Sequence, residues 1–169
     1  MQSEPTTAHD TPDPGSASDA EGPAHAETTL RLRDQIRLFH DASPSTVIAT
    51  TDDTGAISLR IGAFDGAYLS LAVPVTAPEG LDGWRPVTLD LDAAASRPIT
   101  VLLRLNLVGE GGREHRHDAL ILTEGPRQVS FDLLAFDLDQ LAPEDVWVDV
   151  ILSNSAHTDV RITQLEATG

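Results

Sequence analysis

Five side chains of this sequence combine the chemical groups that recognise a sugar: Tyr68, Arg104, Asn106, Trp147 and Asp149. Each stands between two apolar residues, so we expect it on the outward face of a strand. An indole and a phenol offer flat apolar surfaces, while amide, carboxylate and guanidinium groups hydrogen-bond to hydroxyls. If the strands are neighbours, these side chains converge on one exposed sheet face. The alternative is that Trp147 packs under a loop and Arg104 pairs with Asp149 across two strands.

Two histidines suggest a transition-metal site. His115 and His117 are two residues apart, so on one strand they share a face and can both reach a metal ion. Arg113 and Arg116 stand beside them, and cationic neighbours disfavour a bound cation. The alternative is a solvent-exposed hairpin end.

Calcium needs only oxygen ligands, and acidic turns can supply them. Asp52 and Asp53, followed by Gly55, form one such turn, and Asp137 with Asp139 forms another. We expect no cofactor otherwise, with structural calcium as the open alternative.

These residues depend on a series of short strands that runs almost to the C-terminus. Apolar and polar residues alternate most cleanly over 67–73 and 87–92, which is typical of an antiparallel sheet with one buried face. Residues 29–41 fit a helical face as well as a strand. We expect strands near 35–40, 47–51, 57–61, 67–73, 86–92, 98–108, 116–123, 127–134, 146–153 and 158–166.

Turn signals separate these strands at 52–55, 77–80, 109–112 and 124–126. About ten strands without a long helix predict an all-β fold, an antiparallel β-sandwich or jelly roll, rather than an α/β layer fold.

Four stretches of the sequence carry a resemblance to a known family. They are IRLFHD at 36–41, FDGAYLSL at 64–71, RP at 97–98 leading to RLN at 104–106, and WVDVI at 147–151. In this order, from about Asp34 to Leu165, they resemble an uncharacterised domain-of-unknown-function family of small alphaproteobacterial proteins. The resemblance implies a jelly-roll module similar to carbohydrate-binding and galactose-binding-like domains, with no assigned activity. It also favours a strand over 36–40.

The composition changes once along the chain. Residues 1–28 contain four prolines and several Asp and Glu, with no arginine and one strongly apolar side chain, Met1. Such a segment cannot bury enough surface to offset its ordering entropy. We therefore expect a disordered acidic tail over 1–28 and a β-sandwich domain over 29–169.

Charge excludes several classes of partner. The chain has 27 acidic and 11 basic residues, all of the latter arginine, for a net charge of -16. A field of that sign repels nucleic acid and anionic lipid, so we expect neither as a partner. There is no cysteine. No segment is apolar enough to insert into a membrane, and no signal peptide is visible, so we expect a cytoplasmic protein, with export by another route as the alternative.

The sequence lacks the usual enzyme motifs. It has no Gly-x-Ser-x-Gly elbow and no phosphate-binding loop, so we expect no catalytic residues, although a hydrolase with paired carboxylates is an alternative. The favoured hypothesis is a non-catalytic module that binds a glycan on an exposed sheet face. A structural or protein-interaction module in an intracellular complex is the rival hypothesis, and an apolar ligand in a barrel cavity is a third. The oligomeric state is left open.

Overall fold

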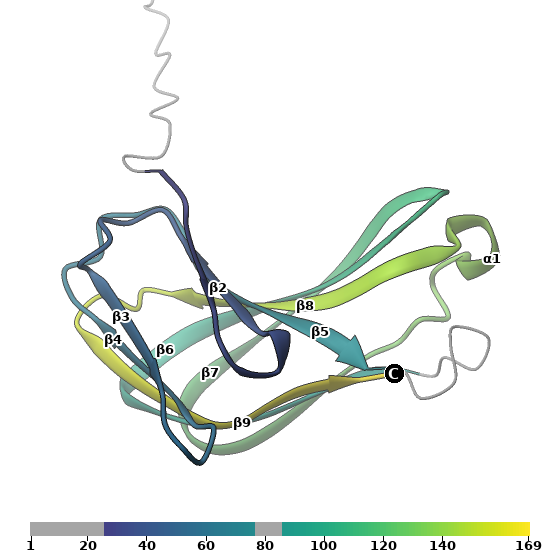
Figure 1. Ribbon diagram of the computed structural model, residues 1–169. Helices are drawn as coiled ribbons and strands as arrows, with labels where there is room; N and C mark the ends of the chain where they lie inside the picture. The colour runs from purple at the N-terminus through teal and green to yellow at the C-terminus, as the bar shows by residue number, and fades with distance from the viewer. Residues whose placement is uncertain (1–25, 77–85) are drawn as a thin grey trace, which may run out of the picture.

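Strands account for most of the chain that this computed structural model describes, residues 26–76 and 86–169 (Figure 1). The strands are β1 (Thr28–Arg31), β2 (Arg37–His40), β3 (Val47–Thr51), β4 (Ile57–Ile61), β5 (Leu69–Thr76), β6 (Val87–Gly109), β7 (Gly112–Phe131), β8 (Pro143–Ser153) and β9 (Thr158–Thr168). A single 3-10 turn, η1 (Arg33–Gln35), joins β1 to β2, and a one-turn helix, α1 (Leu138–Leu141), precedes β8.

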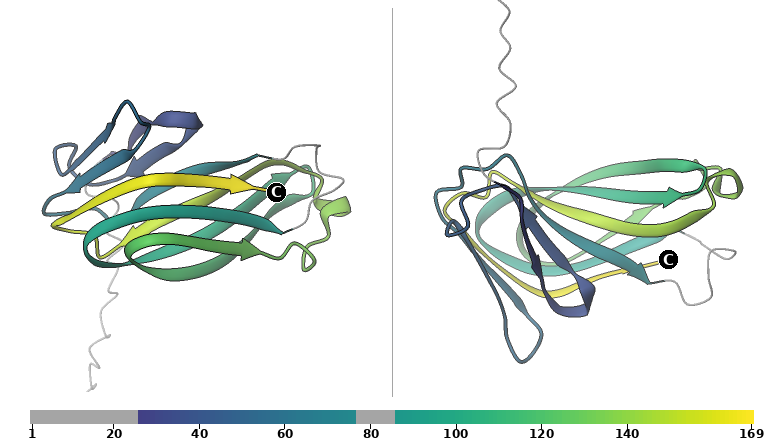
Figure 2. Two further views of the ribbon diagram at one scale, coloured as in Figure 1. Left: turned by 90° about the horizontal axis from the view of Figure 1, so that it is seen from below. Right: turned by 45° about the horizontal axis from the view of Figure 1, so that its top comes forward.

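The strands form one hydrogen-bonded path that folds into two layers (Figures 1 and 2). The path runs β1-β2-β5-β8-β6-β9-β4-β3, with β7 paired to β6. Residues 100–109 of β6 pair with β8, whereas residues 88–95 pair with β9, and β7 follows β6 along both halves. We call the layer of β1, β2, β5, β8 and the second half of β6 the first sheet. The layer of β3, β4, β9 and the first half of β6 is the second sheet.

The core lies between the two sheets and is aliphatic. The first sheet contributes Leu71, Leu103 and Val150, which are aligned across β5, β6 and β8 and are buried. The second sheet contributes Leu59 and Val160, a cross-strand pair on β4 and β9. These buried residues occupy the apolar positions of the alternating pattern, and the all-β sandwich is confirmed.

The ends of several elements differ from the sequence prediction. Two long strands replace the four expected over 86–134, because β6 and β7 bend between the sheets instead of ending. The turn expected at 124–126 lies inside β7, where Gly125 adopts a φ of 94° and pairs with Ala93, next to the register shift between Ala94 and Ile99 of β6. The turns at 52–55 and 109–112 are confirmed, and the turn at 77–80 lies outside the described residues. The strand β1 was not predicted, since it is short and mostly polar.

The expected disordered tail lies mostly outside the described residues, and the boundary between 28 and 29 stays a prediction. No helix in the two described stretches is long and apolar enough to cross a membrane.

Candidate functional site

Four of the five predicted side chains lie together on the outward surface of the first sheet, which we call the outer face. In one row across the sheet, Arg37 of β2 is aligned with Ala72 of β5, Asp149 of β8, Arg104 of β6 and His117 of β7. The next row contains Pro74, Trp147, Asn106 and His115. The alternation of the strands therefore brings residues from widely separated parts of the chain onto one surface.

Asp149 is the centre of this group. Its Oδ2 atom accepts hydrogen bonds from Arg104 Nη2 at 2.7 Å, Arg104 Nε at 3.0 Å and Asn106 Nδ2 at 2.9 Å. Its Oδ1 atom accepts one from Trp147 Nε1 at 3.1 Å. Asp149 and Asn106 are buried even though they point away from the core, at 7% and 3% exposed. The pairing of Arg104 with Asp149, which was the alternative to a binding role for both, is present.

Trp147 is half-buried on the outer face. Its single polar atom is engaged with Asp149, so the remaining surface of the indole is apolar. The cross-strand neighbours are Pro74 on one side and Asn106 on the other. The ring is thus held by a hydrogen bond at one edge, in the manner of a fixed platform.

Tyr68 is not brought into this group. It precedes β5, six residues before Pro74, which places it about 20 Å from the Trp147 row along an extended strand. Its hydroxyl donates a hydrogen bond to Glu27, and this contact raises the pKa of Tyr68 to about 12. Its backbone N–H is bound by the buried Asp41 carboxylate at 3.0 Å. Tyr68 therefore holds Glu27, the residue that precedes β1, at the edge of the first sheet.

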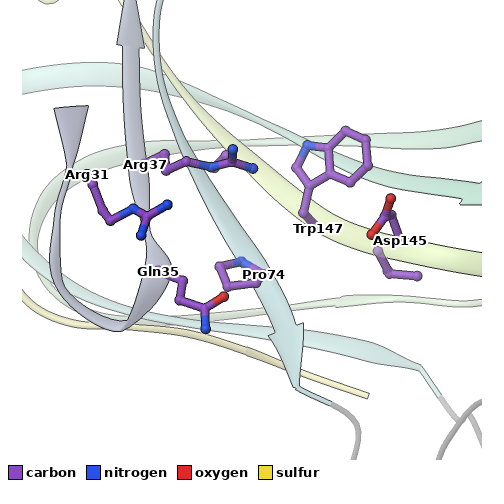
Figure 3. A pocket seen from close by; sticks show the side chains of 8 residues that line it. Arg31, Gln35, Arg37, Pro74, Asp145 and Trp147 are labelled. Atoms are coloured by element: carbon purple, nitrogen blue, oxygen red, sulfur yellow. The ribbon is translucent and has the colours of Figure 1, made fainter. Parts of the chain in front are cut away.

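A groove of about 640 Å³ runs beside Trp147, and we call it the β5 groove. Its floor consists of Ala72 and Pro74, small outward residues of β5. The elements on either side of β5, the β1–β2 hairpin and β8, carry longer outward side chains. These side chains rise above Ala72 and Pro74 and form the two walls of the groove. Figure 3 shows the arrangement, with side chains from the β1–β2 hairpin on one side of Pro74 and side chains from β8 on the other. The lining residues are Arg31, Gln35, Arg37, Ala72, Pro74, Asp145, Val146 and Trp147.

Sequence reasoning missed the hairpin wall, which consists of Arg31, Gln35 and Arg37. Arg31 and Arg37 are direct cross-strand partners on β1 and β2, and both are exposed. Residues 28–31 read TTLR, with one apolar residue and no alternation, so the sequence contains no signal for this strand. Nothing in the sequence pattern places this hairpin across β5 from β8.

His115 and His117 lie at the far edge of the outer face, on β7. Their rings meet edge to face, with centroids 4.9 Å apart and planes at 72°. His117 is aligned with Arg104 and His115 with Asn106. The prediction that the two histidines share one face of a strand is confirmed, and a metal ion between them stays a prediction.

The calcium candidates lie in two separate places. Asp52 closes the turn between β3 and β4 by accepting hydrogen bonds from the backbone of Thr54 and Ala56, both at 3.0 Å. Its other oxygen pairs with Arg161 at 2.8 Å. The Thr54 hydroxyl and the Arg161 guanidinium hold the pKa of Asp52 well below its usual range. Asp53 is exposed in the same turn.

The second candidate pair lies at α1. Asp137 is the N-cap residue and accepts a hydrogen bond from Gln140 N at 3.0 Å, while Asp139 is exposed in the first turn. Among the residues that the structure describes, no three histidine, aspartate or glutamate side chains gather as a metal site would require. Structural calcium stays a prediction.

Comparison with solved structures places the fold among carbohydrate-binding modules. TmCBM61, solved in complex with β-1,4-galactotriose, matches with a TM-score of 0.51 at 11% identity, over 81% of this chain and 90% of that one. The family 11 module of the cellulosomal cellulase Lic26A-Cel5E of Clostridium thermocellum matches with a TM-score of 0.42 at 12% identity, over 86% and 96%. At such low identity the likeness shows a shared fold and nothing more.

Comparison of the sequence gives the family. None of the curated proteins compared with the chain matches it. The model of one protein family matches residues 15–168, which confirms the resemblance to a family without assigned function, while an alphaproteobacterial origin stays a prediction. The chain belongs to the family described as a family of unknown function, DUF6478.

Proposed function

We propose that this protein is a non-catalytic module that binds a saccharide chain in the β5 groove. The observation that carries the proposal is Trp147, an indole on an outward sheet face, fixed at one edge by Asp149 and forming the wall of a groove. Sugar rings stack on aromatic faces because their axial C–H groups form an apolar surface. Gln35, Arg37 and Asp145 supply hydrogen-bonding groups around that wall.

The fold supports the proposal without carrying it. TmCBM61, which shares this fold, is solved with a galactose trisaccharide. Because one fold can support many functions, it is the groove itself that supports a binding role.

A binding role suits the groove better than a hydrolytic one. Glycosidases usually need two carboxylates that flank the scissile bond. Among the described lining residues, Asp145 is the one carboxylate. The nearby Asp149 already accepts four hydrogen bonds from Arg104, Asn106 and Trp147.

The test is a glycan array followed by calorimetric titration of any saccharide that binds. Trp147→Ala is expected to weaken binding about tenfold or more, the usual effect of removing an aromatic anchor. Trp147→Phe keeps a ring but also loses the hydrogen bond to Asp149, so it separates stacking from the Asp149 contact. It is expected to retain most of the affinity.

The control is Ile48→Ala, which removes an exposed apolar side chain from β3 on the second sheet. It is expected to leave the affinity unchanged. Absence of any bound glycan with folded protein would refute the proposal, and so would unchanged binding by Trp147→Ala. Either result would favour the rival hypothesis of a protein-interaction module.

A further inference from the structure

The hairpin wall of the β5 groove carries two positive charges that face each other. Arg31 and Arg37 are direct partners in the antiparallel pairing of β1 with β2, and both line the groove. Like charges placed directly opposite one another on a sheet are destabilising. A protein with a net charge of -16 has many carboxylates that could neutralise this pair, so the arrangement calls for an explanation.

The carboxylates near this pair do not neutralise it. Asp34, at the tip of the same hairpin, lies 3.8 Å from Arg33. Asp149 is bound by Arg104. Within residues 26–76 and 86–169, no ion pair involves Arg31 or Arg37. Arg37 is held instead over the ring of Phe39, with 5.6 Å from the guanidinium carbon to the ring centroid.

The turn at the tip of the hairpin is a second energetically unfavourable feature, in addition to the pair of like charges. Asp34 and Gln35 have φ angles of 49° and 64°, and Ile36 N donates to Arg33 O at 2.8 Å. This is the geometry of a type I′ turn, whose second central position strongly favours glycine. Here the position holds Gln35, and its side chain lines the groove. Strained backbone and other exceptions to local preference are found frequently at ligand-binding sites.

An anionic ligand would resolve the repulsion between the arginines. A guanidinium presents several N–H donors in a plane, which match the two oxygens of a carboxylate. The opposite wall carries the Trp147 indole and one carboxylate, Asp145, which can accept hydrogen bonds from hydroxyls. The groove therefore offers donors for an anion on one side and a stacking surface with an acceptor on the other.

We propose that the ligand of the β5 groove is an acidic saccharide, a chain of sugar rings that carry carboxylates, with Arg31 and Arg37 binding a carboxylate while Trp147 stacks on a ring. This inference rests on the proposed function and adds the class of saccharide. The net charge of the protein disfavours a densely charged polymer such as DNA, which carries one charge per roughly 1.7 Å of its length. A uronate chain carries one charge per ring. Screening beyond about 8 Å at physiological ionic strength leaves the charges of the groove itself, two from Arg31 and Arg37 and one of opposite sign from Asp145, so the groove keeps a net positive charge.

The test uses two saccharides that differ only in the proposed feature. Hexamers of β-1,4-linked glucose and of β-1,4-linked glucuronic acid share their ring and linkage and differ in the carboxylate. Two further pairs differ in the same way: mannan with mannuronan, and methyl-esterified galacturonan with free galacturonan. Calorimetric titration at low and high NaCl is expected to show at least tenfold tighter binding of the uronate member of one pair, and a smaller preference at high salt.

Matched variants test whether Arg31 and Arg37 cause the preference for the uronate. Arg31→Gln combined with Arg37→Gln is expected to abolish the preference for the uronate and to leave the protein folded, because both side chains are exposed. Arg60→Gln removes one arginine from β4 on the second sheet, where its nearest carboxylate is 3.7 Å away, and is expected to change nothing.

The other outcomes separate the two proposals. Trp147-dependent binding of neutral and acidic saccharides with equal affinity would overturn this inference and leave the proposed function standing. A preference for uronates that survives in the double arginine variant, or binding of sulfated glycans alone, would also overturn it. Failure of every saccharide to bind would remove the proposed function itself.

Discussion

At the scale of single residues, Asp149 determines what Trp147 can do. A buried carboxylate is costly unless hydrogen bonds replace its lost water, and here four donors do so. Arg104 and Asn106 saturate one oxygen, which leaves the other for the indole N–H. The ring is therefore positioned before any ligand arrives, and a ligand that stacks on it pays less ordering entropy.

The pKa of Tyr68 can be measured without interference from other phenols, because it is the sole tyrosine of the chain. Its hydrogen bond to Glu27, followed by desolvation, raises its pKa from 10.0 to about 12. A spectrophotometric titration of phenolate is expected to show this value in the folded protein. Glu27→Gln is expected to bring the pKa back toward 10, since it removes the charged acceptor.

The same shift has a consequence for stability. Between pH 10 and 12 the folded protein keeps the Tyr68 proton while the unfolded chain loses it, so the unfolded state binds fewer protons. The free energy of unfolding therefore falls as the pH rises through that window, and this group contributes no pH dependence below it. Circular dichroism at each pH serves as the control for folding. A midpoint near 10 in a folded protein would contradict the contact with Glu27.

At the scale of elements, the β1–β2 hairpin combines a strained turn with its place on the groove wall. Gln35→Gly is expected to raise the free energy of unfolding by about 1 kcal/mol, because glycine adopts a positive φ without strain. Gln35→Ala is the matched control, since it removes the same side chain and keeps the strained φ. Urea denaturation measures both.

Equal stability of the glycine and alanine variants would show that the turn is not strained. Both variants lack the amide that lines the groove, so both are expected to bind a saccharide ligand more weakly than the parent protein. A gain in stability with a loss of binding is the pattern expected where a site retains strain for function.

The elements also show what could be predicted from the sequence. Alternation identified the core strands and the outward set around Asp149, because a two-residue period is a local property. It failed at Gly125, since a glycine inside a bent strand and a glycine in a turn look alike locally. Alternation also could not predict the groove. Arg37 and Trp147 lie on strands separated by β5, and a local pattern contains no information on the order of strands in a sheet.

At the scale of the whole molecule, the long strands β6 and β7 continue from one sheet into the other, and β5 of the first sheet also pairs with β9 of the second over two residues. Residues 100–109 of β6 belong to the first sheet and residues 88–95 to the second, and β7 continues through both in the same way. The core side chains of the two sheets form one cluster. Neither sheet can lose its pairing with β6 without exposing the apolar face of the other.

The two sheets are therefore expected to unfold together in a single transition. In a Trp84→Phe background, Trp147 is the one indole and its fluorescence reports the first sheet. The chain has no cysteine, so Ile48→Cys, an exposed position of β3, can carry a fluorophore that reports the second sheet. Urea titration is expected to give the same midpoint and slope for both probes and for far-UV circular dichroism. Two separate midpoints would show that the bend in β6 and β7 acts as a hinge between independent units.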